Sequence, residues 1–191
     1  MRKLAYLLSI GMIVAVLPVG ARAADDVPLA GRYERVYDKA YLTAHKGQIV
    51  ERVTLVIKPP PKLDAPEFRS IIAYAELKIW VRSVRQSFDS TGACSEEGEG
   101  LSCGGSLSAA EADTCKSKRD GIRDCRIDPN DAGSFRIEAK PEGVLVVISP
   151  RLELVQAPYD AGPFLNLSQT NAENHAFFLK AASAGCNGKN Q

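Results

Sequence analysis

Two histidines are the residues of this chain best suited to acid–base chemistry. His45 and His175 are its only imidazoles, and an imidazole changes charge near neutral pH. Either one, beside a carboxylate, could serve a periplasmic hydrolase. Neither, however, lies in a G-x-S-x-G, H-E-x-x-H or cysteine-plus-histidine signature. His45 is therefore interpreted first as a partly buried residue that fixes the loop after the first strand, and the hydrolase is an alternative.

Aromatic side chains that carry a polar atom form a second group of candidates. Such side chains line barrel mouths and protein interfaces, although in β-proteins they also commonly lie at the rim of the core. The sequence therefore offers a candidate binding surface made of Tyr33, Tyr37, Tyr41, His45 and Trp80.

Five cysteines form the third group, and their odd number leaves at least one without an intrachain partner. Pairing of neighbours predicts the bridges Cys94–Cys103 and Cys115–Cys125, with Cys186 left over. Closing each loop of about 10 residues would stabilise the fold by about 2–3 kcal/mol. Because no C-x-x-C, calcium loop or phosphate-binding glycine loop is present, the sequence predicts neither a metal site nor a cofactor.

The first 23 residues have the features of a cleavable signal peptide. Arg2 and Lys3 precede an apolar run over 4–19, and Ala21-Arg22-Ala23 gives the small-x-small cleavage pattern. Cleavage there leaves residues 24–191 as one domain, periplasmic or secreted, with no membrane span and a net charge of 21 − 23 = −2. This charge does not favour a nucleic-acid partner.

The pattern of the remaining chain predicts extended structure. Strands are expected over 31–38, 50–58, 71–82, 84–90, 134–138, 144–149, 151–155 and 175–180, with a helical turn or compact loop over 39–48. The segment 71–82 alternates cleanly, with Trp80 on its polar face, although a helical stripe through Leu77, Trp80 and Val84 is a competing interpretation. Residues 94–131 are poor in large apolar side chains and predict an irregular, cysteine-containing excursion, while 156–174 is expected to be loop.

These elements indicate an all-β fold, an antiparallel barrel or sandwich of about eight strands. A lipocalin-like barrel is preferred over the sandwich.

The opening Gly31-x-Tyr33-x-Arg35-x-Tyr37-Asp38-x-x-Tyr41-Leu42-x-x-His45-x-x-Gln48-x-Val50 resembles the start of a group of exported bacterial proteins of unknown function. The resemblance implies export and a β-rich fold, and it assigns no catalytic residue.

An exported β-scaffold without a catalytic signature favours a non-enzymatic binding module. Its partner would be a small apolar ligand or an extracytoplasmic protein, and an inhibitor with a plugging loop such as 94–103 is one specific form. A hydrolase that uses His45 or His175 and an envelope structural or assembly protein are the alternatives.

Overall fold

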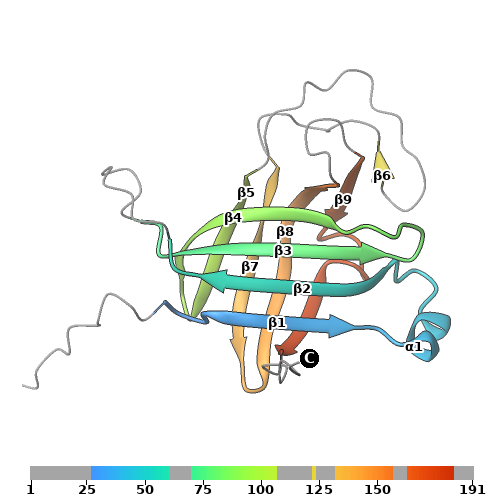
Figure 1. The fold of residues 1–191 in the computed structure, drawn as a ribbon, viewed down its shortest axis with the longest axis horizontal. Helices are drawn as coiled ribbons and strands as arrows, with labels where there is room; N and C mark the ends of the chain where they lie inside the picture. Colours follow the sequence, from blue (N-terminus) through green and yellow to red (C-terminus); the bar gives the residue numbers. More distant parts are fainter. Residues whose placement is uncertain (1–26, 61–69, 107–121, 124–131, 157–162, 183–191) are drawn as a thin grey trace, which may run out of the picture.

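The structure, a computed structural model, describes residues 27–60, 70–106, 122–123, 132–156 and 163–182. Nearly all of its regular elements are strands (Figure 1). Their bounds are β1 Gly31–Val36, α1 Lys39–Ala44, β2 Val50–Lys58, β3 Ala73–Val81, β4 Phe88–Glu97, β5 Gly100–Ser106, β6 Ile122–Arg123, β7 Gly133–Lys140, β8 Gly143–Val155, β9 Phe164–Ser168 and β10 Ala176–Ala181.

Eight of the strands close into an antiparallel barrel, as predicted. Hydrogen-bonded pairing runs in the order β1-β2-β3-β4-β5-β7-β8-β10 and returns from β10 to β1. Figure 1 shows β1 to β4 crossing in front of β5, β7 and β8 at a steep angle. The long strand β8 pairs with β10 through its first half and with the extra strand β9 through its second half, and β6 pairs with β9.

The alternation over 71–82 produces a strand and not a helix. Ala75, Leu77 and Ile79 of β3 point inward and are fully buried, whereas Glu76 and Lys78 between them face solvent on the outer wall. Trp80 is on the same outer wall. This period of two residues is the pattern of a half-buried antiparallel strand.

The barrel interior is filled by side chains of the strands themselves. Phe88, Phe135 and Phe177 are fully buried, together with aliphatic side chains from every strand of the barrel except β1 and β4. A side chain that lined a space large enough for a water molecule would have exposed area, and these core side chains have 0–2%. The described core side chains therefore form one closely packed cluster.

Three predicted boundaries are wrong. Residues 94–106, predicted as the first part of the excursion, belong to β4 and β5, where main-chain pairing and a disulfide compensate for the scarcity of large side chains. Within the predicted loop 156–174, residues 164–168 form β9 along the second half of β8. The strand predicted over 84–90 begins only at Phe88, after a turn. The rest of the predicted excursion, apart from β6, lies outside the described residues.

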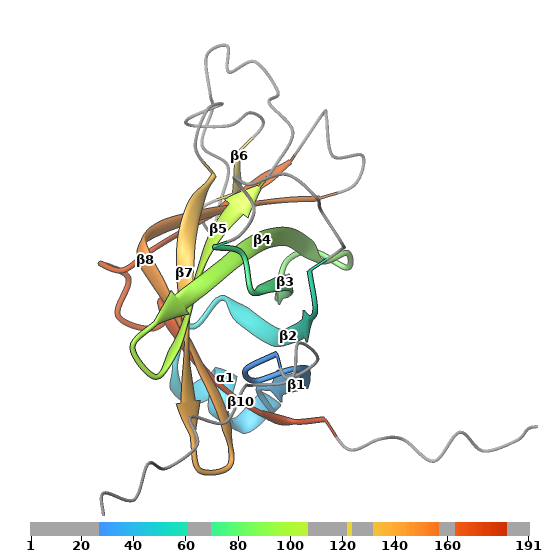
Figure 2. The same cartoon turned by 90° about the vertical axis from the view of Figure 1, so that its left-hand side faces the viewer.

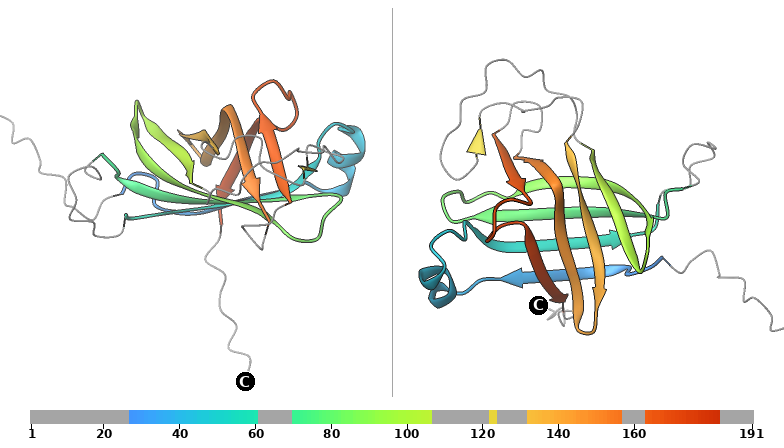
Figure 3. Two further views of the ribbon diagram at one scale, coloured as in Figure 1. Left: turned by 90° about the horizontal axis from the view of Figure 1, so that it is seen from above. Right: turned by 180° about the vertical axis from the view of Figure 1, so that it is seen from behind.

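The barrel is least completely paired where β10 returns to β1, a place we call the seam. Pairing between β1 and β2 covers all of Gly31–Val36, but pairing between β1 and β10 covers only Tyr33 and Glu34 of β1. From behind, β10 lies beside β8 and crosses β1, and α1 lies beyond the end of β1 (Figure 3). The view turned by 90° also places α1 near β1 and β10 (Figure 2). The seam and α1 therefore share one corner of the barrel, the α1 corner.

Candidate functional site

Four side chains form a continuous stack at the α1 corner, which we call the aromatic column. The Arg35 guanidinium carbon lies 4.9 Å from the centre of the Tyr37 ring. The ring centres of Tyr37 and Tyr41 are 5.0 Å apart, and those of Tyr41 and His45 are 4.0 Å apart with the two planes only 15° from parallel. All four side chains are partly exposed. The column is thus a partly exposed row of aromatic and cationic groups, in which Tyr37 also packs against the core.

Local sequence explains why these side chains meet. Arg35 and Tyr37 point to the same side of β1 because alternate residues of a strand share a face. Asp38 then caps α1, since its side-chain oxygen accepts a 2.7 Å hydrogen bond from the backbone N–H of Tyr41. Tyr41 and His45 are four residues apart, which places them on one face of a helical turn.

The orientation of the His45 ring follows from its contacts. Its Nδ1 lies 2.9 Å from the carbonyl oxygen of Tyr41. A carbonyl oxygen only accepts, so Nδ1 is the donor of this hydrogen bond. The backbone N–H of His45 donates to the same carbonyl at 2.9 Å and ends the helix. The imidazole is therefore fixed in orientation by its own helix.

Arg82 holds the segment that follows α1 from one side. Its guanidinium donates 2.8 Å to the carbonyl oxygen of His45 and also donates to that of Gln48. Its backbone N–H donates to the carbonyl of Ile49 at 3.0 Å. A single arginine from the β3–β4 turn thus satisfies main-chain carbonyls that would otherwise depend on water.

Asn174 holds the same segment from the other side. Its side-chain oxygen accepts from the N–H groups of Ile49 at 3.0 Å and Val50 at 3.3 Å. Its amide nitrogen donates to the carbonyl of Gly47 at 2.8 Å and to the side chain of Asn171 at 3.1 Å. Asn174 is completely buried. A fully hydrogen-bonded buried amide of this kind fixes two segments far apart in sequence in one arrangement.

Burial affects the acid–base behaviour of the column. Desolvation raises the pKa of Tyr37 above its ordinary value, and the positive charge of Arg35 opposes that rise. The Tyr37 hydroxyl therefore remains protonated at neutral pH and can serve as a hydrogen-bond donor.

Of the five residues predicted to form a binding surface, the structure brings three together. Tyr33 is not part of the column, and its hydroxyl donates to the carbonyl of Leu29 at 3.0 Å. Trp80 lies on the outer wall with the Arg52 guanidinium 4.7 Å above its ring. Tyr37, Tyr41 and His45 remain as one cluster.

Sequence reasoning missed three residues of this corner. Arg35 alternates with Tyr37 along the strand, and this spacing could have included it in the column. Arg82 and Asn174 gave no signal, because an arginine at the end of a predicted strand and an asparagine in a predicted loop are both commonplace.

The second histidine does not join the cluster as a catalytic partner. His175 repeats the local arrangement of His45, with Nδ1 2.8 Å from the carbonyl oxygen of Asn171. Across the described part of the chain, neither imidazole has a carboxylate within ion-pair distance. The geometry positions both rings but assembles no acid–base pair around them.

One predicted disulfide is confirmed. Cys94 of β4 and Cys103 of β5 are directly opposite in the register, are both fully buried, and are joined by a disulfide. Cys115, Cys125 and Cys186 lie outside the described residues.

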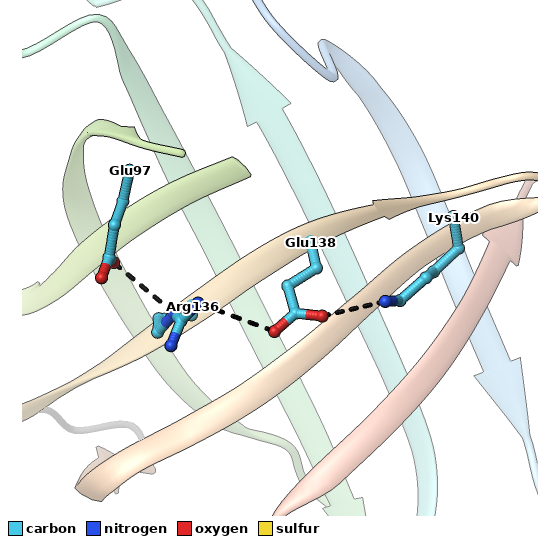
Figure 4. Close-up of polar contacts among 4 residues, drawn as sticks. All are labelled: Glu97, Arg136, Glu138 and Lys140. Atoms are coloured by element: carbon cyan, nitrogen blue, oxygen red, sulfur yellow. Dashed lines mark hydrogen bonds and ion pairs between the residues drawn. The ribbon is translucent and has the colours of Figure 1, made fainter. Parts of the chain in front are cut away.

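The outer face of β7 carries a different kind of polar cluster, the charged ladder (Figure 4). Arg136 lies between Glu97 at 3.5 Å and Glu138 at 3.8 Å, and the Lys140 ammonium donates to Glu138 at 2.9 Å. That hydrogen bond lowers the pKa of Glu138. The four side chains are 35–48% exposed, so water screens their interactions.

Further properties of the described residues limit the chemistry on offer. They contain no group of three or more histidine, cysteine, aspartate or glutamate side chains placed to hold a metal ion. Nor do they form a helix with the length and hydropathy that a membrane crossing requires. Comparison with protein families, with curated proteins and with solved structures finds no match to this chain.

Proposed function

We propose that this chain is an exported, non-enzymatic binding module that recognises a protein partner with its α1 corner. The observation that carries the proposal is the aromatic column, four partly exposed aromatic and cationic groups in one rigid row. Tyrosine and arginine dominate the energetics of protein interfaces, and they bind best when little side-chain freedom is lost on association.

Arg82 and Asn174, which together we call the clamp, support this choice. Neither side chain closes the barrel; both hold the segment after α1 that carries His45. Such support reduces the entropic cost of binding because the column is already ordered.

A small apolar ligand inside the barrel is less well supported. Such a ligand needs a cavity of about 300 Å³ or more. The described interior is occupied by its own phenylalanine and aliphatic side chains, so an internal ligand would have to displace the core. The hydrolase alternative lacks a carboxylate partner for His45 or His175 among the described residues.

Capture from an extract of exported proteins tests the proposal. The exported form of the chain is immobilised and compared with Tyr41→Ala and with Arg136→Gln, a matched change on the outer face of β7. We expect Tyr41→Ala to reduce the captured partner by at least about tenfold, as loss of an aromatic anchor does, and Arg136→Gln to leave it unchanged. Equal capture by wild type and Tyr41→Ala would refute the assignment of the corner.

A further inference from the structure

The seam between β1 and β10 leaves main-chain groups of β10 without a partner strand. The backbone N–H of Ile148 in β8 donates to the carbonyl of His175 at 2.8 Å. The backbone N–H of Ala182 donates to the carbonyl of Arg32 at 2.8 Å. Because successive residues of a strand direct their N–H and C=O groups to opposite sides, residues 175, 177 and 179 face β8 while 176, 178 and 180 face the seam. Only Lys180 of these three pairs with β1.

Ala176 and Phe178 therefore present two N–H and two C=O groups toward a strand position that no described residue occupies. Continuing the register of β1 and β10 would place Val36 opposite Phe178, but the two strands separate before that point. After β1, the backbone N–H of Tyr37 donates to the carbonyl of Glu51, next to β2, at 2.9 Å. Because the main-chain groups of successive residues point to opposite sides, those of Val36 face the seam.

The side chains beside this edge are unusually apolar for the outer wall. Val36 is 60% exposed and is the one large hydrophobic residue of the described chain that is mostly exposed. Phe178 of β10, on the other side of the seam, is partly exposed because its neighbours Phe177 and Leu179 point into the core. Tyr37 follows Val36 directly in sequence, and its ring lies on the other side of the chain, with Arg35.

We propose that the α1 corner takes its partner as an added β-strand, an extended peptide that pairs with Ala176 and Phe178 of β10 and places alternate apolar side chains against Val36 and Phe178. An unpaired edge with alternating pockets is how sheets recognise extended peptides, since the main chain supplies affinity and the flanking side chains supply specificity. This inference rests on the proposed function and specifies how that surface would be used.

A defined probe tests strand addition. The probe is a short capped peptide in which valine and threonine alternate between a terminal lysine and a terminal glutamate, and the control peptide has proline in place of the inner valines. Amide exchange is followed by NMR on the exported chain. We expect the probe to slow exchange at Ala176 and Phe178 by at least about tenfold at saturation and the proline peptide to have no effect.

A matched pair of variants tests the same contact from the protein side. Ala176→Pro removes the N–H at the first residue of β10 but leaves the pairing of Phe177 and Leu179 with β8, whereas Ala176→Val keeps the N–H. We expect Ala176→Pro to weaken binding of the probe about five- to tenfold, as loss of one hydrogen bond does. Ala176→Val should bind the probe as tightly as the wild type does. If circular dichroism shows that Ala176→Pro does not fold, the test is whether the probe slows amide exchange at Phe178 in the wild type.

Strand addition is refuted if the probe leaves exchange at Ala176 and Phe178 unchanged, or if it protects amides elsewhere. It is equally refuted if a folded Ala176→Pro binds the probe as tightly as wild type does. Partner capture that is lost in Tyr41→Ala but unchanged in a folded Ala176→Pro would retain the proposed function and refute strand addition alone.

Discussion

The α1 corner and the charged ladder on β7 both join polar side chains from different strands or turns, but they hold them in different ways. At the corner, buried Asn174 and the Arg82 guanidinium bond directly to main-chain atoms, and the rings of the column stack on one another. In the charged ladder, long charged side chains of β4 and β7 contact one another, each 35–48% exposed to water. The first arrangement fixes a geometry, whereas the second keeps an outer face soluble at little energetic gain.

The largest effect is expected when Asn174, the buried residue of the clamp, is replaced. Asn174→Ala leaves the N–H groups of Ile49 and Val50 and the carbonyl of Gly47 without their partner. Because buried unsatisfied groups each cost free energy, we expect the free energy of unfolding to fall by about 3 kcal/mol, measured in urea. Asn174→Asp, which keeps an acceptor but loses the donor, is the comparison. A loss of less than about 1 kcal/mol in Asn174→Ala would mean that the clamp does not order the corner.

A milder change weakens the clamp from its exposed side. Arg82→Met keeps the apolar stem and removes the guanidinium that donates to His45 and Gln48. We expect a loss of about 1 kcal/mol in the free energy of unfolding, because the contact with His45 is exposed and water can replace the guanidinium there, whereas the contact with Gln48 is partly buried. Arg85→Met, at an exposed position in the same turn, is the control and should change stability by less than about 0.5 kcal/mol. Equal effects of the two variants would contradict a specific role for Arg82.

The smallest effect is expected on the charged ladder. Because the pKa of Glu138 is lowered in the folded chain, chiefly by its hydrogen bond with Lys140, its contribution to stability is present above the unfolded-state pKa and is lost as pH falls through the folded-state value. Solvent screening should keep that contribution below about 0.5 kcal/mol.

Lys140→Gln tests this directly. It should return the pKa of Glu138 toward its ordinary value, as measured by NMR titration, and should leave stability near pH 7 almost unchanged. A large loss of stability at pH 7 would show that the ladder is structural after all.

The sequence predicted the barrel because its walls follow strict alternation. The inward residues of β3 are apolar, and the residues between them, Tyr74, Glu76, Lys78 and Trp80, all carry a polar group, so the sequence identifies the buried face of this strand. Residues 94–106 escaped prediction because serine, glycine and cysteine bury little area, so pairing and the Cys94–Cys103 bridge define those strands instead. β9 escaped because five residues next to prolines resemble a loop.

The candidate site was predictable in part. Tyr37, Tyr41 and His45 stood out by residue type, and their spacing across a helical turn brings them together. Asn174 could not be recognised because it acts on Gly47 and Val50 across more than 120 residues of sequence, a relation that only the closed barrel creates.

Site-specific photo-cross-linking tests the central claim most directly. A photoreactive phenylalanine analogue is placed at position 41 in the aromatic column or at position 138 in the charged ladder, and residues 24–191 of the chain are irradiated in an extract of exported proteins. We predict one discrete cross-linked species from position 41 and none from position 138. The same species from both positions, or from position 138 alone, would contradict the assignment of partner binding to the α1 corner.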